Sequence, residues 1–132
     1  MLVAGAVLAG IAALIHVLIF VLESITWSVP RTWRRFGVTS QADAEVIRPM
    51  AFNQGFYNLF LAIGALVGIV LLATPVAQAG FAVTAFATAS MLAAALVLVL
   101  SSPRLGRAAA TQGAAPLVAL ILLVASVLVP AG

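Results

Sequence analysis

Four apolar stretches, separated by shorter polar segments, dominate the pattern of this chain. Apolar residues run almost without interruption over 2–24, 50–74, 78–101 and 108–129. Each stretch is long enough for a helix that crosses a hydrocarbon core of about 30 Å, which needs ~20 residues at 1.5 Å each. The pattern therefore predicts an all-α fold, a single transmembrane domain over residues 1–132 built as a four-helix bundle.

The longest connection, residues 25–49, has a pattern of its own. Ser40 is followed three residues later by Asp43, which matches the capping box at the start of a helix. We therefore expect a short interfacial helix over about 40–48. Pro49 then falls in the first turn of the second transmembrane helix, where a missing N–H costs little.

Two tryptophans, Trp27 and Trp33, lie in the same connection. Tryptophan is enriched at membrane–water interfaces, so both are predicted to anchor the connection at the headgroup level. The connection as a whole is interpreted as an amphipathic link between two helices. The functional alternative is a lid over the mouth of the bundle.

Charged residues are scarce and unevenly placed. Of the 132 residues, 65% are hydrophobic and only 7% are charged, which excludes an ordinary soluble domain. All six basic residues are arginines in the first and third connections, namely Arg31, Arg34, Arg35, Arg48, Arg104 and Arg107. By the positive-inside rule, both connections face the cytoplasm and both termini the other side of the inner (plasma) membrane. This placement makes the net charge of +3 a topology signal, and no nucleic-acid partner is predicted.

Polar side chains interrupt the second apolar stretch on one helical turn. They are Asn53, Gln54, Tyr57 and Asn58. Lipid offers such groups no partners, and an unpaired polar group in hydrocarbon costs several kcal/mol. Another helix, water or a ligand must therefore satisfy them.

The first helix carries a matching stripe of His16, Glu23 and Trp27, which lie within ~40° of one another at 100° per residue. If the first two helices are antiparallel, His16 faces the level of Tyr57 and Glu23 lies near Met50–Asn53. The predicted ligand-binding residues are accordingly His16, Glu23, Trp27, Asn53, Gln54, Tyr57 and Asn58. The alternative is that these groups only hold helices together, at ~0.6–2 kcal/mol each.

Several kinds of chemistry find no support in the residues. The chain has no cysteine and one histidine, so thiol chemistry and haem ligation by two histidines of one chain are excluded. His16 and Glu23 are ~10.5 Å apart along a helix, too far to share a metal ion. No metal and no cofactor is predicted. The same two residues are the candidates for acid–base catalysis, if the protein is an enzyme, which the sequence leaves open.

The string from His16 to Ser24, followed by Trp27, and the string from Ala51 to Gly64 resemble a small bacterial family of four-helix membrane proteins, domain of unknown function 1304. The resemblance implies the fold and a membrane location. It implies no activity.

Three functions are compatible with these observations. The leading hypothesis is a site that binds, and possibly acts on, a small lipid-like, isoprenoid-like or quinone-like molecule, because apolar walls with a few polar groups form such sites. One alternative is a small proton-coupled exporter that uses Glu23. The other is an accessory subunit without chemistry in a larger membrane complex. Glycine and alanine faces, such as Gly64 with Gly68, also allow a homodimer within the bilayer.

Overall fold

The computed structural model describes residues 1–129, and every regular element among them is helical. The elements are α1 (Leu2–Phe20), a π-helical turn (Val21–Ile25), α2 (Pro30–Trp33), a 3-10 turn (Arg34–Phe36), α3 (Gln41–Leu72), α4 (Ala77–Ser101), a second 3-10 turn (Pro103–Leu105) and α5 (Gly106–Leu128). The helices α1, α3, α4 and α5 are long and apolar enough to cross a membrane. The predicted all-α, four-helix architecture of a multi-pass membrane protein is confirmed.

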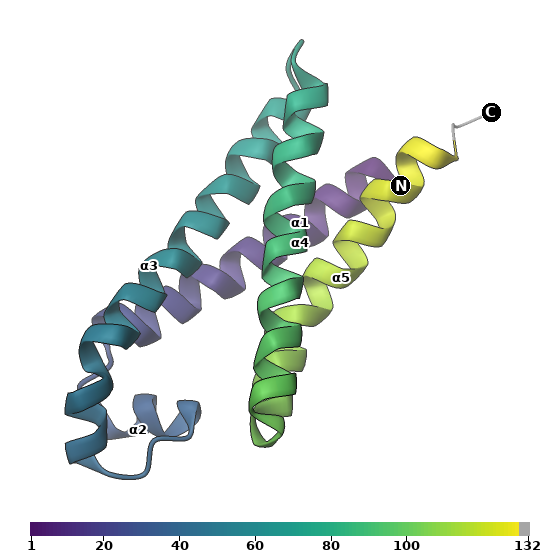
Figure 1. Cartoon of the computed structure of the whole chain (residues 1–132). Helices are drawn as coiled ribbons and strands as arrows, with labels where there is room; N and C mark the ends of the chain where they lie inside the picture. Colours follow the sequence, from purple (N-terminus) through teal and green to yellow (C-terminus); the bar gives the residue numbers. More distant parts are fainter. Residues whose placement is uncertain (130–132) are drawn as a thin grey trace.

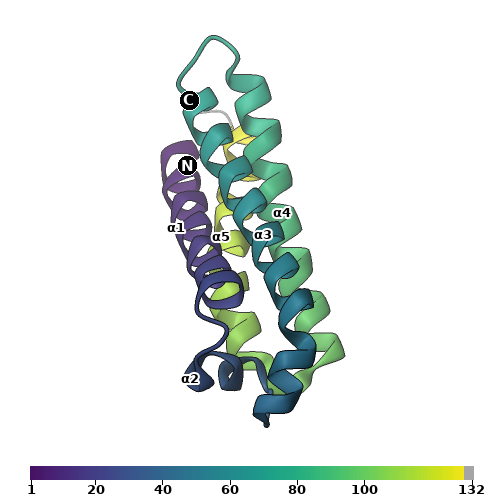
Figure 2. The same cartoon turned by 90° about the vertical axis from the view of Figure 1, so that its left-hand side faces the viewer.

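The four long helices form a bundle in which each packs against two neighbours. Helix α1 lies beside α3 and α5, and α4 lies beside the same two helices (Figures 1 and 2). The start of α1 and the end of α5 lie at one end of the bundle, and α2 lies at the other (Figure 1). We call the latter the α2 end.

Small residues fill the interior of the bundle. A core cluster consists of Ala12, Ala13, Ala62, Ala65, Ala87 and Met91, while leucines, valines and phenylalanines cover the outside. This distribution suits a bilayer, because lipid tails solvate large apolar side chains and small residues let helices approach closely. The backbones of α3 and α4 approach each other closely, since a Cβ on Gly80 would lie 2.5 Å from the backbone nitrogen of Leu72. The structure thus uses small-residue faces within one chain, and a homodimer stays a prediction.

Residues 40–48 do not form the separate interfacial helix that we expected. They are the first turns of α3, which continues through Pro49 to Leu72. The capping prediction is confirmed, since the backbone N–H of Asp43 donates to Ser40 Oγ at 3.1 Å. Proline removes only one helical hydrogen bond, the one to the carbonyl of Glu45. Because Glu45 and Pro49 are both exposed, water can satisfy that carbonyl and the helix continues.

Residues 26–40, which we call the connector, fold back on the first turns of α3. Trp27 and Trp33 are only 5% and 2% exposed and pack with Ala44 and Ala51. The indole N–H of Trp27 donates to the carbonyl of Ala44 at 2.9 Å. The prediction that these tryptophans anchor the protein among lipid headgroups is therefore wrong. Their large apolar surfaces are buried inside a small core of the connector.

Candidate functional site

Glu23 lies in the π-helical turn at the end of α1. This turn contains the wider hydrogen bond typical of a π-helix, from the N–H of Thr26 to the carbonyl of Val21 at 2.9 Å. Single π turns are common at functional sites. The Glu23 side chain is only 8% exposed, and its Oε2 accepts a hydrogen bond from Asn58 Nδ2 at 2.9 Å. A carboxyl group from α1 and an amide from α3 therefore meet inside the bundle.

A glycine makes this meeting possible. A Cβ on Gly55 would collide with Ser24 Oγ and lie 3.1 Å from Glu23 Cβ. The Ser24 hydroxyl also donates to the carbonyl of Phe52 at 2.8 Å, which ties α1 to α3 at the same level. The absence of a side chain at Gly55 thus lets the two helices approach closely enough for Asn58 to reach Glu23.

A cavity of about 630 Å³, which we call the main cavity, opens beside this pair at the α2 end and is lined by all four long helices. Its volume is in the range of small-molecule sites, ~300–1,000 Å³. Its polar lining residues are Glu23, Arg35, Gln54, Asn58, Ser101, Thr111 and Gln112. Its apolar lining residues are Ile15, Leu18, Ile19, Leu22, Phe36, Ala94, Val97, Leu98, Leu105 and Ala108. The cavity therefore combines apolar walls with a set of hydrogen-bonding and charged groups.

The connector takes part in this lining. Arg35 and Phe36 come from its 3-10 turn, and Leu105 comes from the turn between α4 and α5. Gly37 adopts a left-handed conformation with φ of 81°, and a Cβ on it would lie 3.7 Å from Leu105. The connector thus reaches across to the α4–α5 turn at the α2 end. The lid that the sequence allowed as an alternative stays a prediction.

Of the predicted ligand-binding residues, Glu23, Gln54 and Asn58 line the main cavity together. Asn53 and Tyr57 do not join them. Both are exposed, Tyr57 by 55%, and they lie on the outer face of α3. At 100° per residue, Asn53 is ~160° away from Gly55, the position that contacts α1. The packing of Gly55 against α1 therefore turns Asn58 toward the interior, and Gln54 lines the cavity while its side chain stays exposed.

The remaining two predicted residues also lie apart from the cavity lining. His16 is 1% exposed, and its Nδ1 is 2.9 Å from the carbonyl oxygen of Ala12 in its own helix. Trp27 belongs to the core of the connector. The expected convergence of all these groups does not occur. In particular, Glu23 lines the cavity and His16 does not, so the structure does not present the two as an acid–base pair to one ligand.

Four polar lining residues were not among the predicted ones, namely Arg35, Ser101, Thr111 and Gln112. Thr111 and Gln112 stand out in the sequence as polar residues near the start of the fourth apolar stretch. That signal marks them as unusual but does not say which helix they face. Arg35 is one of several arginines in its connection, and only the fold of the connector selects it.

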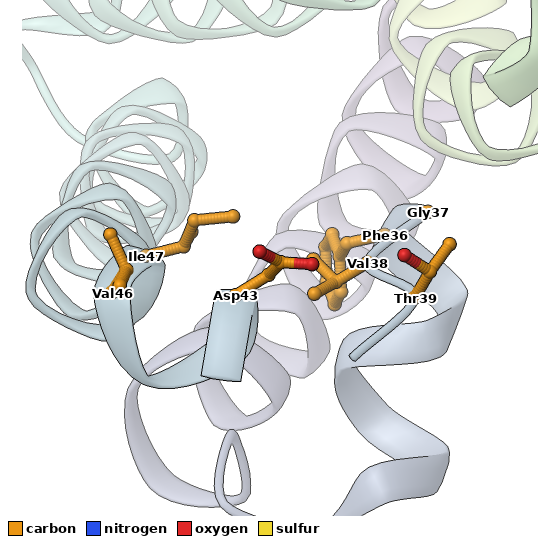
Figure 3. A pocket seen from close by; sticks show the side chains of 7 residues that line it. All are labelled: Phe36, Gly37, Val38, Thr39, Asp43, Val46 and Ile47. Carbon is orange, nitrogen blue, oxygen red and sulfur yellow. The ribbon is translucent and has the colours of Figure 1, made fainter. Parts of the chain in front are cut away.

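A second hollow, of about 440 Å³, lies between the connector and the first turns of α3 (Figure 3). All its lining residues belong to the segment 36–47, and its carboxylate is that of Asp43. Asp43 Oδ2 already accepts a hydrogen bond from Ser40 at the start of α3. We therefore assign this hollow to local packing. Within residues 1–129, no three His, Cys, Asp or Glu side chains are grouped so that they could hold a metal ion.

Comparison with known proteins identifies the family and nothing more specific. No curated protein and no solved structure shows significant similarity to this chain. The family described as "Protein of unknown function (DUF1304)" matches residues 10–124, which include the connector, Glu23, Asn58 and the whole main cavity. The chain therefore belongs to the DUF1304 family of proteins of unknown function.

Proposed function

We propose that this protein binds a small amphiphilic molecule, lipid-like, isoprenoid-like or quinone-like, in the main cavity. The observation that supports the proposal is the cavity of about 630 Å³ in which apolar walls adjoin Glu23, Gln54 and Asn58. An amphiphile would place its chain against residues such as Leu18 and Val97 and its polar head against the carboxyl and amide groups. Such a head supplies the hydrogen bonds that these groups lack in hydrocarbon.

The proposed setting is the inner (plasma) membrane, with the α2 end in the cytoplasm. All the arginines lie at this end, in the connector, the first turns of α3, the α4–α5 turn and the start of α5, which agrees with the positive-inside rule. A ligand would then enter at the level of the cytoplasmic headgroups, where Arg35 and Phe36 of the connector line the cavity. The connector would cover the bound head.

Native mass spectrometry of the gently extracted protein tests the proposal. Ala108 and Ala110 are exposed positions on α5, but only Ala108 lines the cavity. We expect a bound mass on the wild type and on the Ala110→Phe variant, and its loss from Ala108→Phe, whose ring occupies the cavity. A wild type without bound mass, or a mass that both variants retain, would contradict the proposal. Proton release that depends on Glu23 when a hydrophobic cation is added would favour an exporter instead.

A further inference from the structure

The main cavity is lined by two side chains of opposite charge that do not pair with each other. Glu23 accepts a hydrogen bond from Asn58, and among residues 1–129 no arginine donates to it. Arg35 lines the same cavity, yet no nitrogen of Arg35 comes within the 4.0 Å of an ion pair with Glu23. Each charge in a site with apolar walls is stabilised by an opposite charge. Among residues 1–129, buried Glu23 therefore has no cationic partner, and exposed Arg35 has no carboxylate partner.

The two charges lie at different depths. Glu23 belongs to the π-helical turn that follows α1 and is almost fully buried, next to the apolar wall formed by Leu18, Ile19 and Leu22. Arg35 comes from the connector, beyond the end of α1, and is exposed. A chain lying along the apolar wall therefore meets the negative charge first and the positive charge further out. The hydrogen bond from Asn58 occupies Oε2 of Glu23, which leaves Oε1 for a ligand.

We propose, on the basis of the proposed function, that the ligand has a zwitterionic head with its cation next to the tail and its anion further out. The ammonium group binds Glu23, and the outer carboxylate, sulfonate or phosphate binds Arg35. Alkyl betaines and other amphiphiles with an amino group at the end of the chain have this order of charges. Bilayer phospholipids with phosphocholine or phosphoethanolamine heads have the reverse order, so the site excludes them by placing like charges together.

Two detergents with the same tail length and opposite charge order provide the test. Dodecyl sulfobetaine has its ammonium next to the tail, and dodecylphosphocholine has its phosphate there. Both are titrated, below the concentrations at which they form micelles, into the full-length protein held in an amphipol. We expect the sulfobetaine to bind about tenfold more tightly. The Glu23→Gln and Arg35→Gln variants should each reduce this ratio to about one, and Arg31→Gln, an exposed residue outside the cavity, should leave it unchanged.

The outcomes separate this inference from the proposed function. Equal binding of the two detergents, or tighter binding of dodecylphosphocholine, would overturn the charge order. If the detergents bind in either of these ways but do not bind to the Ala108→Phe variant, the proposed amphiphile site in the main cavity is still supported. Failure of both detergents to bind, together with the absence of a co-purified mass, would overturn both proposals. Circular dichroism and gel filtration of the Glu23→Gln variant verify that it is folded, and an unchanged ratio in a folded variant contradicts the role of Glu23.

Discussion

Asn58 of α3 donates a hydrogen bond of 2.9 Å to the carboxyl group of Glu23 at the end of α1. The two residues are far apart in the chain and belong to the two polar groups that the sequence singled out. Both residues line the main cavity, so their hydrogen bond places one member of each polar group at its wall. It also joins two helices, so its structural and ligand-binding roles have to be separated by experiment.

Replacing Asn58 should destabilise the protein more than replacing Asn53 on the same helix. Asn58→Ala removes the bond to Glu23 and leaves a buried carboxyl group without this partner, a loss of about 0.6–2 kcal/mol. Asn53 is exposed on the outer face, so Asn53→Ala should change stability by less than about 0.5 kcal/mol. Thermal unfolding in detergent measures both. Equal losses would mean that the Asn58–Glu23 bond contributes nothing specific.

The close approach of α1 and α3 should depend on Gly55. A Cβ at this position collides with Ser24 Oγ, so Gly55→Ala must move one helix or the other and is expected to cost about 1–3 kcal/mol. Gly106 is a matched control, because a Cβ there meets nothing within 4 Å. Chemical unfolding of the two alanine variants gives the comparison. A stable Gly55→Ala variant with an intact bundle would show that the interface is looser than described.

The two tryptophans of the connector should respond differently to loss of their indole N–H. Trp27 donates to the carbonyl of Ala44, whereas Trp33 Nε1 is buried without a hydrogen-bond partner among residues 1–129. Both Phe variants lose volume, but only Trp27→Phe also breaks a hydrogen bond, so it should cost about 1 kcal/mol more. Unfolding followed by circular dichroism measures the difference. The reverse order would indicate that Trp33 finds a partner outside this chain.

His16 should prove structural. It is buried, its ring contacts the backbone of its own helix, and it does not line the main cavity. His16→Ala is therefore expected to lower stability by about 2–4 kcal/mol through the void it leaves, while any co-purified ligand is retained. Native mass spectrometry of the folded fraction provides the second readout. Loss of the ligand from that fraction would restore His16 to the binding site.

The orientation in the membrane can be tested directly because the chain has no cysteine. Ser28 and Gln78 are exposed and lie in or next to connections at opposite ends of the bundle. With the α2 end in the cytoplasm, a membrane-impermeant thiol reagent should label Gln78→Cys in intact cells and Ser28→Cys only after lysis. The opposite labelling would invert the proposed topology.

The resemblance and the apolar pattern were enough to identify the family and the four long helices. The same pattern could not show that α3 begins at Gln41, because Pro49 ordinarily marks a helix start. Whether a helix tolerates an internal proline depends on whether water reaches the released carbonyl. That is decided by where the segment lies in the folded protein.

The candidate site was determined by the sequence only in part. Helical spacing places Asn53, Gln54, Tyr57 and Asn58 on adjacent turns within an arc of ~140°, because that periodicity is a local property of the backbone. Which of them face the interior depends on how α3 is rotated about its axis. That rotation is set by the contact of Gly55 with Ser24, a contact between distant parts of the chain.

The tertiary structure alone brought Arg35, Thr111 and Gln112 to the cavity that Glu23 and Asn58 line. No spacing rule relates residues of the connector, of α5 and of α1, because their distances are fixed by the packing of whole helices. The sequence by itself determined that polar groups lie within the apolar helices and must be satisfied there. Only the folded bundle decided which of them share one cavity.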